Sequence, residues 1–576
     1  MYSSPADPAI ETTLAEAQDF AQEFEQGYKG RVAQLAPLEF ASMMDSLAEH
    51  YDRSSRPGIY AQLLHSRDTG DPDAGRLVAR VREAGAERGK HMVFFSLELA
   101  GLTDQQAEAL AGDPASARYR HTIEEARRYR PHQLSEVEER LLTEVSPVGR
   151  AAWSRLFEEL CAGVRVDLTG QEVPLATALS QLREPDRAVR EEASHAISAA
   201  LGKDLRTRAY VFNITLQDHA LDDRLRSYPT WISGRNLSNE TSDEAVQALV
   251  EAVTSRYDLV RRYYDVKRRL LGFDRLYEWD RYAPLAGADR EVAWADAKEL
   301  VLSSYHRLSP RAGKLVGEFF DAGWIDAPVT QGKTGGAYCL GATPSFHPFV
   351  LMNFTGRLSD ALTLAHELGH GLHDRLAAKQ HIFDYHPPLT LAETASVFGE
   401  AMLFDRILAE EKDPGIRRAL LCHQVEQAFA VIHRQISMNR FENAAHTARR
   451  EEGELSADDL GRIWLDTIRP MFGDSVDLTD EHATWWSYIE HFVHAPGYVY
   501  AYAFGNLLAL SIYRRFREAG PEFADSYLEF LAAGGSRRPD DLVRELGMDI
   551  SNAGFWSAGL DILDEMVTQV EALAAN

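Results

Sequence analysis

Residues 361 to 375 contain the sequence His366-Glu367-Leu368-Gly369-His370, whose residue types and spacing suit metal chemistry. If the segment is an α-helix, His366 and His370 are one turn apart on the same face, so both imidazoles can bind one ion. Zinc takes such a pair as two of three protein ligands and keeps a fourth position open for water. Glu367 would lie beside that position, where its carboxylate can accept a proton from the water. The motif therefore predicts a metal site with a general base next to it.

The third ligand distinguishes among types of zinc site. Metzincins would have Gly at position 373 and His at position 376, but this chain has His373 and Leu376. The other common ligand is a glutamate from a following helix. Residues 389 to 404 are predicted to form such a helix, with Glu393 and Glu400 on one face. A carboxylate in an apolar helix is costly unless it is paired or bound to metal. We predict Glu393 as the third ligand, and Glu400 either as a group that orients a ligand histidine or as half of a structural salt bridge.

Other polar residues near the motif have simpler interpretations. His373 is two turns from His366, roughly 10 Å along a helix axis, which is too far to share an ion, so we expect a core or supporting histidine. His381 and His386 are expected to be surface loop residues. Cys339 is expected to be a buried small apolar residue rather than a functional thiol.

Composition limits the class of protein. The chain has 576 residues, of which 45% are hydrophobic and 26% charged, as in ordinary globular proteins. Its formal net charge of −27 argues against nucleic-acid binding, which needs a basic surface. Three cysteines far apart in sequence indicate a reducing compartment. The N-terminus lacks the features of a signal peptide, and we expect no membrane-spanning segment and a cytoplasmic location.

The pattern along the chain is mostly helical. Residues 241–272 and 503–520 carry apolar side chains at helical spacing, and Ser242 and Ser456 resemble helix caps followed by acidic residues. No linker is evident. We expect a domain boundary near residue 190, which gives an N-terminal helical domain of residues 1–190 and a second domain of residues 191–576.

Residues 332 to 354 break the helical pattern with glycines, prolines and β-branched or aromatic residues. This composition predicts short strands and turns directly before the motif helix. A sheet edge there could bind an extended peptide through its backbone. The alternative is a hairpin with only a structural role.

Residues 485 to 505 form a second unusual segment, rich in tyrosine and histidine around Pro496-Gly497. The tyrosines are two residues apart, as in a strand or extended loop, before a helical pattern resumes. Phenols and imidazoles directed at one cavity could donate hydrogen bonds to an oxyanion. An aromatic core cluster is the alternative.

These segments together resemble an oligoendopeptidase F-type member of the thimet oligopeptidase family of zinc metallopeptidases. The similar segments include Thr363-Leu364-Ala365-His366-Glu367-Leu368-Gly369-His370, Ala392-Glu393-Thr394-Ala395-Ser396 and the stretch from His491 to Tyr502. Segments 134–160 and 270–285 are also similar, so the resemblance covers roughly residues 130 to 576.

The resemblance implies a mainly α, zincin-type fold with a small β-sheet beside the active site, in an elongated molecule split by a deep substrate channel. It implies that residues 191–576 form the catalytic domain, with one Zn²⁺ per chain. The activity it implies is that of a zinc metalloendopeptidase, which hydrolyses internal bonds of short unstructured peptides by Glu-assisted attack of a zinc-bound water. The metal ligands of that family map onto His366, His370 and Glu393, and its catalytic base maps onto Glu367.

The family's oxyanion donors map onto His491, Tyr498 and Tyr502. The choice of Tyr498 over Tyr500, and of His491 over His494, stays open. We expect short peptides as partners, with no nucleic acid and no membrane, and the sequence leaves the oligomeric state open. Alternative functions are a zinc carboxypeptidase or dipeptidyl carboxypeptidase on a similar scaffold and, more remotely, a non-catalytic peptide-binding protein.

Overall fold

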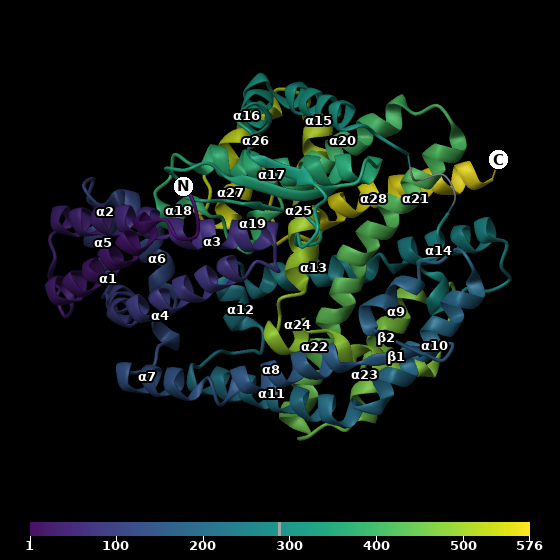
Figure 1. The fold of residues 1–576 in the computed structure, drawn as a ribbon, viewed down its shortest axis with the longest axis horizontal. Helices are drawn as coiled ribbons and strands as arrows, with labels where there is room; N and C mark the ends of the chain where they lie inside the picture. The colour runs from purple at the N-terminus through teal and green to yellow at the C-terminus, as the bar shows by residue number, and fades with distance from the viewer. Residues whose placement is uncertain (286–289, 576) are drawn as a thin grey trace. The chain divides into compact units, whose positions relative to one another are not determined.

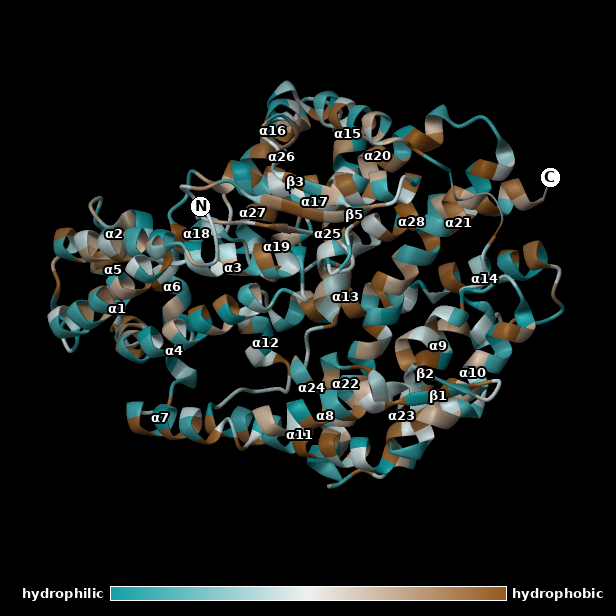
Figure 2. Cartoon of the chain, viewed as in Figure 1, coloured by the Kyte–Doolittle hydropathy of each residue, from teal (hydrophilic) through white to brown (hydrophobic). Residues whose placement is uncertain are grey.

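The computed structural model describes residues 1–285 and 290–575, and helices dominate it (Figure 1). About 72% of the chain is helical and the sheets are small, which confirms the predicted mainly α fold. Most helices contain both hydrophobic and hydrophilic residues, as the mixed colours of Figure 2 show, which suits helices that bury one side. Among the described residues no helix is long and apolar enough to cross a membrane.

Packing divides the chain into two compact units, each built from three segments. Unit 1 comprises Met1–Glu136, Arg290–Arg406 and Arg515–Met548, and unit 2 comprises Val137–Asp289, Ile407–Arg514 and Asp549–Asn576. The boundary that we expected near residue 190 falls inside helix α10 (Arg187–Lys203), within unit 2. The packing units therefore follow a different division from the two sequential domains.

The N-terminal part of unit 1 is a helical bundle. Its first helix is capped by Asp7, whose side chain accepts a hydrogen bond from the main-chain N–H of Ala9. Phe24, Phe40 and Phe94 are buried with neighbouring Met and Leu side chains in one core cluster. Fully burying such a side chain stabilises the fold by about 1.5–3 kcal/mol. The helices of this part are α1 (Pro8–Tyr28), α2 (Pro37–Ser54), α3 (Arg56–Arg67), α4 (Pro72–Gly101), α5 (Asp104–Gly112) and α6 (Arg120–Arg128).

Unit 1 also contains a three-stranded sheet in the order β3-β5-β4, with β4 at an edge. The strands are β3 (Ile325–Pro328), β4 (Tyr338–Leu340) and β5 (Phe349–Phe354); β3 is parallel to β5 and β4 is antiparallel to it. The fully buried ammonium group of Lys333 donates to the carbonyl oxygens of Asp326, Pro328 and Met352, which fixes the β3–β4 loop. The short strands and turns predicted for residues 332–354 are present.

Helix α17 (Leu358–Ala377) packs against β4 and β5 and carries the His-Glu-x-x-His sequence. Asp360 in its first turn accepts hydrogen bonds from the main-chain N–H groups of Thr355 and Arg357, which caps the helix start. The remaining helices of unit 1 are α15 (Trp294–Leu308), α16 (Pro310–Asp321), α18 (Ile382–Tyr385), α19 (Leu389–Ala392), α26 (Phe523–Ala532) and α27 (Pro539–Glu545).

In the described part of unit 2, the named strands are β1 (Arg165–Leu168) and β2 (Gln171–Pro174), which form an antiparallel hairpin, and the other regular elements are helices. The predicted caps are present: Ser242 caps α13 and Ser456 caps α23. The unit contains α7 (Glu136–Val145), α8 (Arg150–Gly163), α9 (Leu175–Gln181), α10, α11 (Leu205–Leu225), α12 (Ser233–Ser238), α13 (Asp243–Ser255), α14 (Tyr257–Leu271), α21 (Pro414–Val431), α22 (His433–Glu451), α23 (Ala457–Phe472), α24 (His491–His494) and α28 (Ala553–Ala574). Helices α20 (Ser396–Glu410) and α25 (Tyr500–Ala519) contribute residues to both units.

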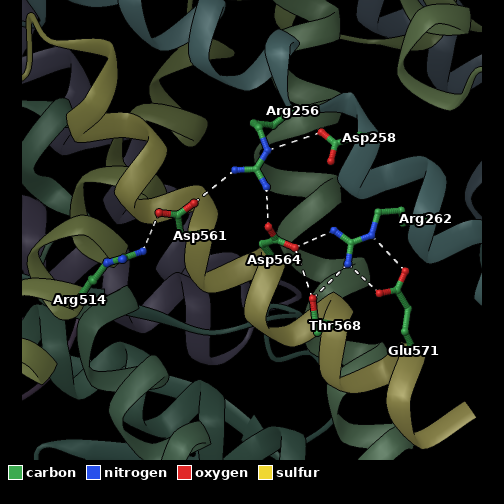
Figure 3. Close-up of polar contacts among 8 residues, drawn as sticks. All are labelled: Arg256, Asp258, Arg262, Arg514, Asp561, Asp564, Thr568 and Glu571. Carbon is green, nitrogen blue, oxygen red and sulfur yellow. Dashed lines mark hydrogen bonds and ion pairs between the residues drawn. The ribbon is translucent and has the colours of Figure 1, made fainter.

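A network of ion pairs attaches the C-terminal helix α28 to α14 within unit 2 (Figure 3). Asp564 of α28 accepts hydrogen bonds from Arg256 at 2.8 Å and from Arg262 at 2.7 Å. Arg262 also binds Glu571 at 2.6 Å, and Glu571 lies two helical turns beyond Asp564 in α28. Because several charges are shared, this network contributes more to stability than an isolated surface pair does.

Candidate metal centre

Helix α17 presents His366 and His370 on one face, as the sequence predicted, and the carboxylate of Glu393 lies opposite them. The Nε2 atoms of the two histidines are 3.4 Å and 3.6 Å from Glu393 Oε2. One ligand atom from each of the three residues lies within 4.8 Å of the others. Ligand atoms about 2.0–2.1 Å from a tetrahedral zinc ion are separated by about 3.3 Å. Two imidazole nitrogens and a carboxylate oxygen at these separations therefore suit Zn²⁺.

Glu393 is not in the middle of a helix, so the continuous helix predicted for residues 389–404 is wrong. Residues 393–395 form a turn between α19 and α20. The carbonyl oxygen of Thr394 accepts a hydrogen bond from the Tyr527 hydroxyl at 3.0 Å, while the Thr394 hydroxyl donates to the Leu391 carbonyl. The Ser396 hydroxyl donates a hydrogen bond to the Glu393 carboxylate at 2.6 Å, which orients this carboxylate.

Both histidines are oriented through contacts away from the proposed ion. His366 Nδ1 is 3.2 Å from Glu400 Oε2, and the ring of His370 is hydrogen-bonded to the main-chain carbonyl of Ala392. Such partners fix the ring orientation and tautomer of metal-binding histidines. The position of Glu400 therefore suits the orienting role, one of the two roles that the sequence left open.

The pKa values of His366, His370 and Glu393 are shifted in different directions. Burial lowers the pKa of His370 to about 4. Burial also opposes protonation of His366, but hydrogen bonds to Glu393 and Glu400 outweigh it and hold its pKa well above the usual value. Burial raises the pKa of Glu393, but the hydrogen bond with His366 and the charge of His370 prevail and lower it to about 2. Glu393 is therefore ionised at neutral pH, as a metal ligand must be.

Glu367 lies beside this cluster and is nearly fully buried, with 6% of its surface exposed. Its carboxylate accepts a hydrogen bond from the main-chain N–H of Cys339 in the edge strand β4. Burial is the main cause that raises its pKa to about 7. A carboxyl group with this pKa can exchange a proton near neutral pH, which is the property that a general base requires.

A cavity of about 390 Å³ adjoins His366, His370, Glu393 and Glu367. His373 is buried at its wall, as expected for a core or supporting histidine. His386 is an exposed loop residue that borders the same cavity, whereas His381 lies against the main-chain carbonyl of Arg118 at 3.0 Å. Burial raises the pKa of the Cys339 thiol well above its usual value, so this group is not a reactive thiolate. The remaining lining residues are Ala337, Tyr338, Gly341, Asp374, Pro387 and Ala392.

In unit 2 the structure brings His491, Tyr498 and Tyr502 together. His491 Nε2 is 3.1 Å from the Tyr502 hydroxyl oxygen, and the rings of Tyr498 and Tyr502 are 5.2 Å apart. The strand or extended loop expected here is wrong, because α25 begins at Tyr500. Tyr498 lies just before α25, with its ring 5.9 Å from that of His491, whereas Tyr500 is fully buried. Its hydroxyl oxygen accepts a hydrogen bond from Asn239 Nδ2 at 2.8 Å.

Sequence reasoning missed the residue that anchors this segment, Glu442 of α22. Its Oε1 atom accepts a hydrogen bond from the main-chain N–H of Gly497 at 2.8 Å, and the side chain is fully buried. Burial raises the pKa of Glu442 to about 8. The only signal in the sequence is an acidic residue among the buried positions of α22. His494, the alternative to His491, lies 3.4 Å from Glu158 instead of in the cluster.

Comparison with known proteins agrees with the class that this site defines, the metallopeptidases. Residues 180–562 match the family described as Peptidase family M3, and residues 98–165 match Oligopeptidase F. The chain belongs to peptidase family M3. The resemblance to oligoendopeptidase F is confirmed, and the chain is a metalloendopeptidase of the oligopeptidase type.

Two relatives illustrate how far the similarity extends. Oligopeptidase PepF of Bacillus subtilis is 27% identical over 95% of this chain and 82% of its own length. Group B oligopeptidase PepB of Streptococcus agalactiae is 28% identical over 90% of this chain and 87% of its own length.

Solved structures share the fold. A putative peptidase from Chlamydophila abortus has a TM-score of 0.85 at 22% identity and covers 93% of this chain and 91% of its own. An oligoendopeptidase-F from Enterococcus faecium has a TM-score of 0.73 at 23% identity and covers 97% of both chains.

Proposed function

We propose that this metalloendopeptidase uses one Zn²⁺ per chain, bound by His366, His370 and Glu393, with Glu367 as the catalytic base. The observation that carries the proposal is the convergence of the three ligand atoms within 4.8 Å of one another, with the buried Glu367 next to them. Hydrolytic zinc sites require imidazole and carboxylate ligands with a general base beside them. Two histidines, the ionised Glu393 and the adjacent Glu367 with its raised pKa meet these requirements.

A zinc ion at this position would act as a Lewis acid that polarises the scissile carbonyl and makes water more acidic. Glu367 accepts the proton of the attacking water and then donates it to the leaving amine. The N–H of Cys339 holds the Glu367 carboxylate in place during this exchange. Glu400 and the Ala392 carbonyl keep the two imidazoles in their binding orientation.

Stabilisation of the oxyanion is proposed for the cluster of His491, Tyr498 and Tyr502. The phenol groups of Tyr498 and Tyr502 are donors, and the contact with His491 at 3.1 Å orients the Tyr502 hydroxyl. Donors of this kind supply catalysis when they meet the charge that develops in the transition state. Tyr500 is left out because its hydroxyl is buried against Asn239.

The substrates we propose are short unstructured peptides cleaved at internal bonds. Strand β4 is an edge strand, and Tyr338 and Cys339 of this strand border the cavity, which supports backbone pairing with an extended peptide. The enclosed substrate channel stays a prediction. So does the cytoplasmic location, which rests on the three widely separated cysteines, all of them unpaired.

The test is Glu367→Gln, assayed for metal content and for turnover of a quenched peptide. We expect turnover to be lost while about one equivalent of zinc stays bound, because Glu367 is a base and not a ligand. Loss of metal in this variant would contradict the assignment. His366→Ala is the matched control, since it should lose both metal and turnover.

Substrate class is tested on the wild-type enzyme. A short peptide should be cleaved internally and at similar rates with a free or an amidated C-terminus. A strict need for the free carboxylate would favour the carboxypeptidase alternative. Denatured casein carrying the same scissile sequence should be cleaved much more slowly than the peptide, and equal rates would exclude an enclosed channel.

A further inference from the structure

Asp374 borders the cavity at the metal centre but has no role in the mechanism described above. It lies on α17 one turn beyond His370, and seven residues beyond Glu367, so the three side chains share a face of the helix. Seven residues correspond to about 10 Å along the axis. An extended peptide advances about 3.3–3.6 Å per residue. A substrate group that reaches Asp374 therefore comes from within about three residues of the scissile bond.

No cation neutralises Asp374 within the described parts of the chain. No ion pair joins its carboxylate to a described residue. The Cys339 thiol donates a hydrogen bond to the carboxylate, with Sγ 3.9 Å from Oδ2. The adjacent Arg375 is bound to Glu318 at 2.8 Å and lies over the Trp324 ring. A thiol is only a weak hydrogen-bond donor and cannot balance a carboxylate charge.

The other titratable groups around Asp374 do not supply a positive charge either. Burial lowers the pKa of His373 to about 3, so this imidazole is neutral. The loop residue His386 is exposed as a whole, but desolvation of its ring at the cavity wall also lowers its pKa. The hydroxyl of Tyr385 is buried and has no hydrogen-bond partner among the described residues. Glu367 carries the same charge sign as Asp374.

The Asp374 carboxylate lies directly against the main chain of Gly341, the residue that follows β4. A Cβ at position 341 would be 2.7 Å and 2.9 Å from its two oxygen atoms, so any larger residue would displace the carboxylate. Gly341 and Asp374 together form one wall of the cavity. The acid is thus held at the surface of the substrate cavity, in a position where burial raises its pKa to about 7.

A half-buried carboxylate without a cation is unfavourable, and a cationic ligand offsets that cost. We propose that Asp374 binds a positively charged group of the peptide substrate and makes the enzyme prefer peptides with lysine or arginine within three residues of the scissile bond. This inference rests on the proposed function. The same chemistry is offered by the free N-terminal amine of a short peptide, and the test separates the two sources.

The experiment uses wild-type holoenzyme, Asp374→Asn and a panel of quenched peptides. Each of the three positions on either side of the scissile bond carries Lys or Arg, or its uncharged counterpart acetyl-lysine or citrulline. Every peptide is made with a free and an acetylated N-terminus. The readout is the ratio of kcat/KM for the charged peptide to kcat/KM for the uncharged one, within each enzyme variant.

We expect the wild-type ratio to reach about 10–100 at one position, as for a hydrogen bond to a charged group. In Asp374→Asn the ratio should fall to about 1. Gly341→Ala, which displaces the carboxylate but keeps its charge, should lower the ratio in part. Asp321→Asn, at an exposed site of α16, is the control and should keep the wild-type ratio. Metal content and circular dichroism report whether each variant is folded.

Three outcomes overturn the inference. A wild-type ratio near 1 at every position shows that no cation is recognised, and an unchanged ratio in Asp374→Asn shows that another group recognises it. A preference that disappears on N-terminal acetylation, and not on neutralising side chains, assigns Asp374 to the amine instead. In each case cleavage of the uncharged peptides and its loss in Glu367→Gln still support the proposed function, so the two ideas can fail separately.

Discussion

The Cα atom of Gly369 lies against the main chain of Ala395, so closely that a Cβ at position 369 would be 2.4 Å from the Ala395 carbonyl oxygen. The same Cβ would be 2.6 Å from the Cα of Ser396. Helix α17 and the turn that carries Glu393 are therefore in direct backbone contact. The glycine between His366 and His370 allows Glu393, the proposed third ligand, to approach them.

The first prediction follows from this contact. Gly369→Ala should separate α17 from the turn and reduce zinc affinity by at least about tenfold, measured by competition with a chelator. The control is Gly85→Ala in α4, where a Cβ meets nothing within 4 Å. This second substitution should stabilise its helix by about 0.5–1 kcal/mol and leave metal binding unchanged. Equal zinc affinity in both variants would show that the turn can move without loss of the site.

The second prediction separates the two roles considered for Glu400. Glu400→Ala should weaken zinc binding by about 10–100-fold, because His366 loses the carboxylate at 3.2 Å that orients its ring. Zinc affinity and the melting temperature of the metal-free protein are measured together. A lower melting temperature with unchanged zinc affinity would assign Glu400 to a structural salt bridge.

The third prediction concerns the tyrosines of unit 2. Tyr498→Phe and Tyr502→Phe should each lower kcat by about 100–1,000-fold, with KM and zinc content nearly unchanged, if each removes one oxyanion donor. Tyr500→Phe is the matched control, since the Tyr500 hydroxyl is bound to Asn239. It should reduce stability more than turnover. If Tyr498→Phe and Tyr502→Phe slow the reaction by less than about tenfold, the cluster is structural.

The fourth prediction is a pH dependence of stability that originates at Glu442. Burial raises its pKa from the ordinary 4.5 to about 8, so the folded state holds a proton that the unfolded chain releases above pH 4.5. The contribution of Glu442 to stability is therefore lost progressively as the pH rises from 4.5 to 8. Glu442→Gln keeps an acceptor for the Gly497 N–H and does not ionise. It should be more stable than the wild type at pH 8, by roughly 1–3 kcal/mol, and no more stable at pH 4.5. Denaturant titrations of both proteins at the two pH values give this difference, and a constant difference would contradict it.

The fifth prediction concerns the ion pairs between α14 and α28. Arg262→Met should lower the free energy of unfolding by about 1–2 kcal/mol, because Asp564 and Glu571 lose a shared partner. Arg76→Met removes an exposed ion pair with Asp73 and should change the free energy of unfolding by no more than about 0.5 kcal/mol. Similar effects of the two substitutions would show that the network adds nothing beyond isolated pairs.

Much of the candidate metal centre was predictable because local rules govern the positions of its residues. The spacing of His366 and His370 needs only a helix, and the caps at Ser242 and Ser456 depend on residues within one turn. The glycines and prolines between residues 332 and 354 likewise predicted short strands.

Features that depend on distant residues were not predictable in this way. The turn at Glu393 requires the Tyr527 hydroxyl, which bonds the Thr394 carbonyl from 133 residues away in sequence. Tyr500 is kept out of the cluster of His491, Tyr498 and Tyr502 by Asn239, which binds its hydroxyl from 261 residues away in sequence. That no described residue supplies a cation to Asp374 could be learned only from the residues that β4 and its neighbours bring to it.

The order of the segments in the two units has a consequence for synthesis on the ribosome. Unit 1 needs Arg515–Met548, and unit 2 needs the segment that starts at Asp549 and contains α28. Unit 1 is incomplete until residue 548 has been translated and unit 2 until α28 has been translated, so the two units cannot fold one after the other in the usual N-to-C order. The nascent chain must keep its unfinished cores from aggregating until its last helices emerge. A product cut short by even the length of α28 lacks one of the segments that build unit 2.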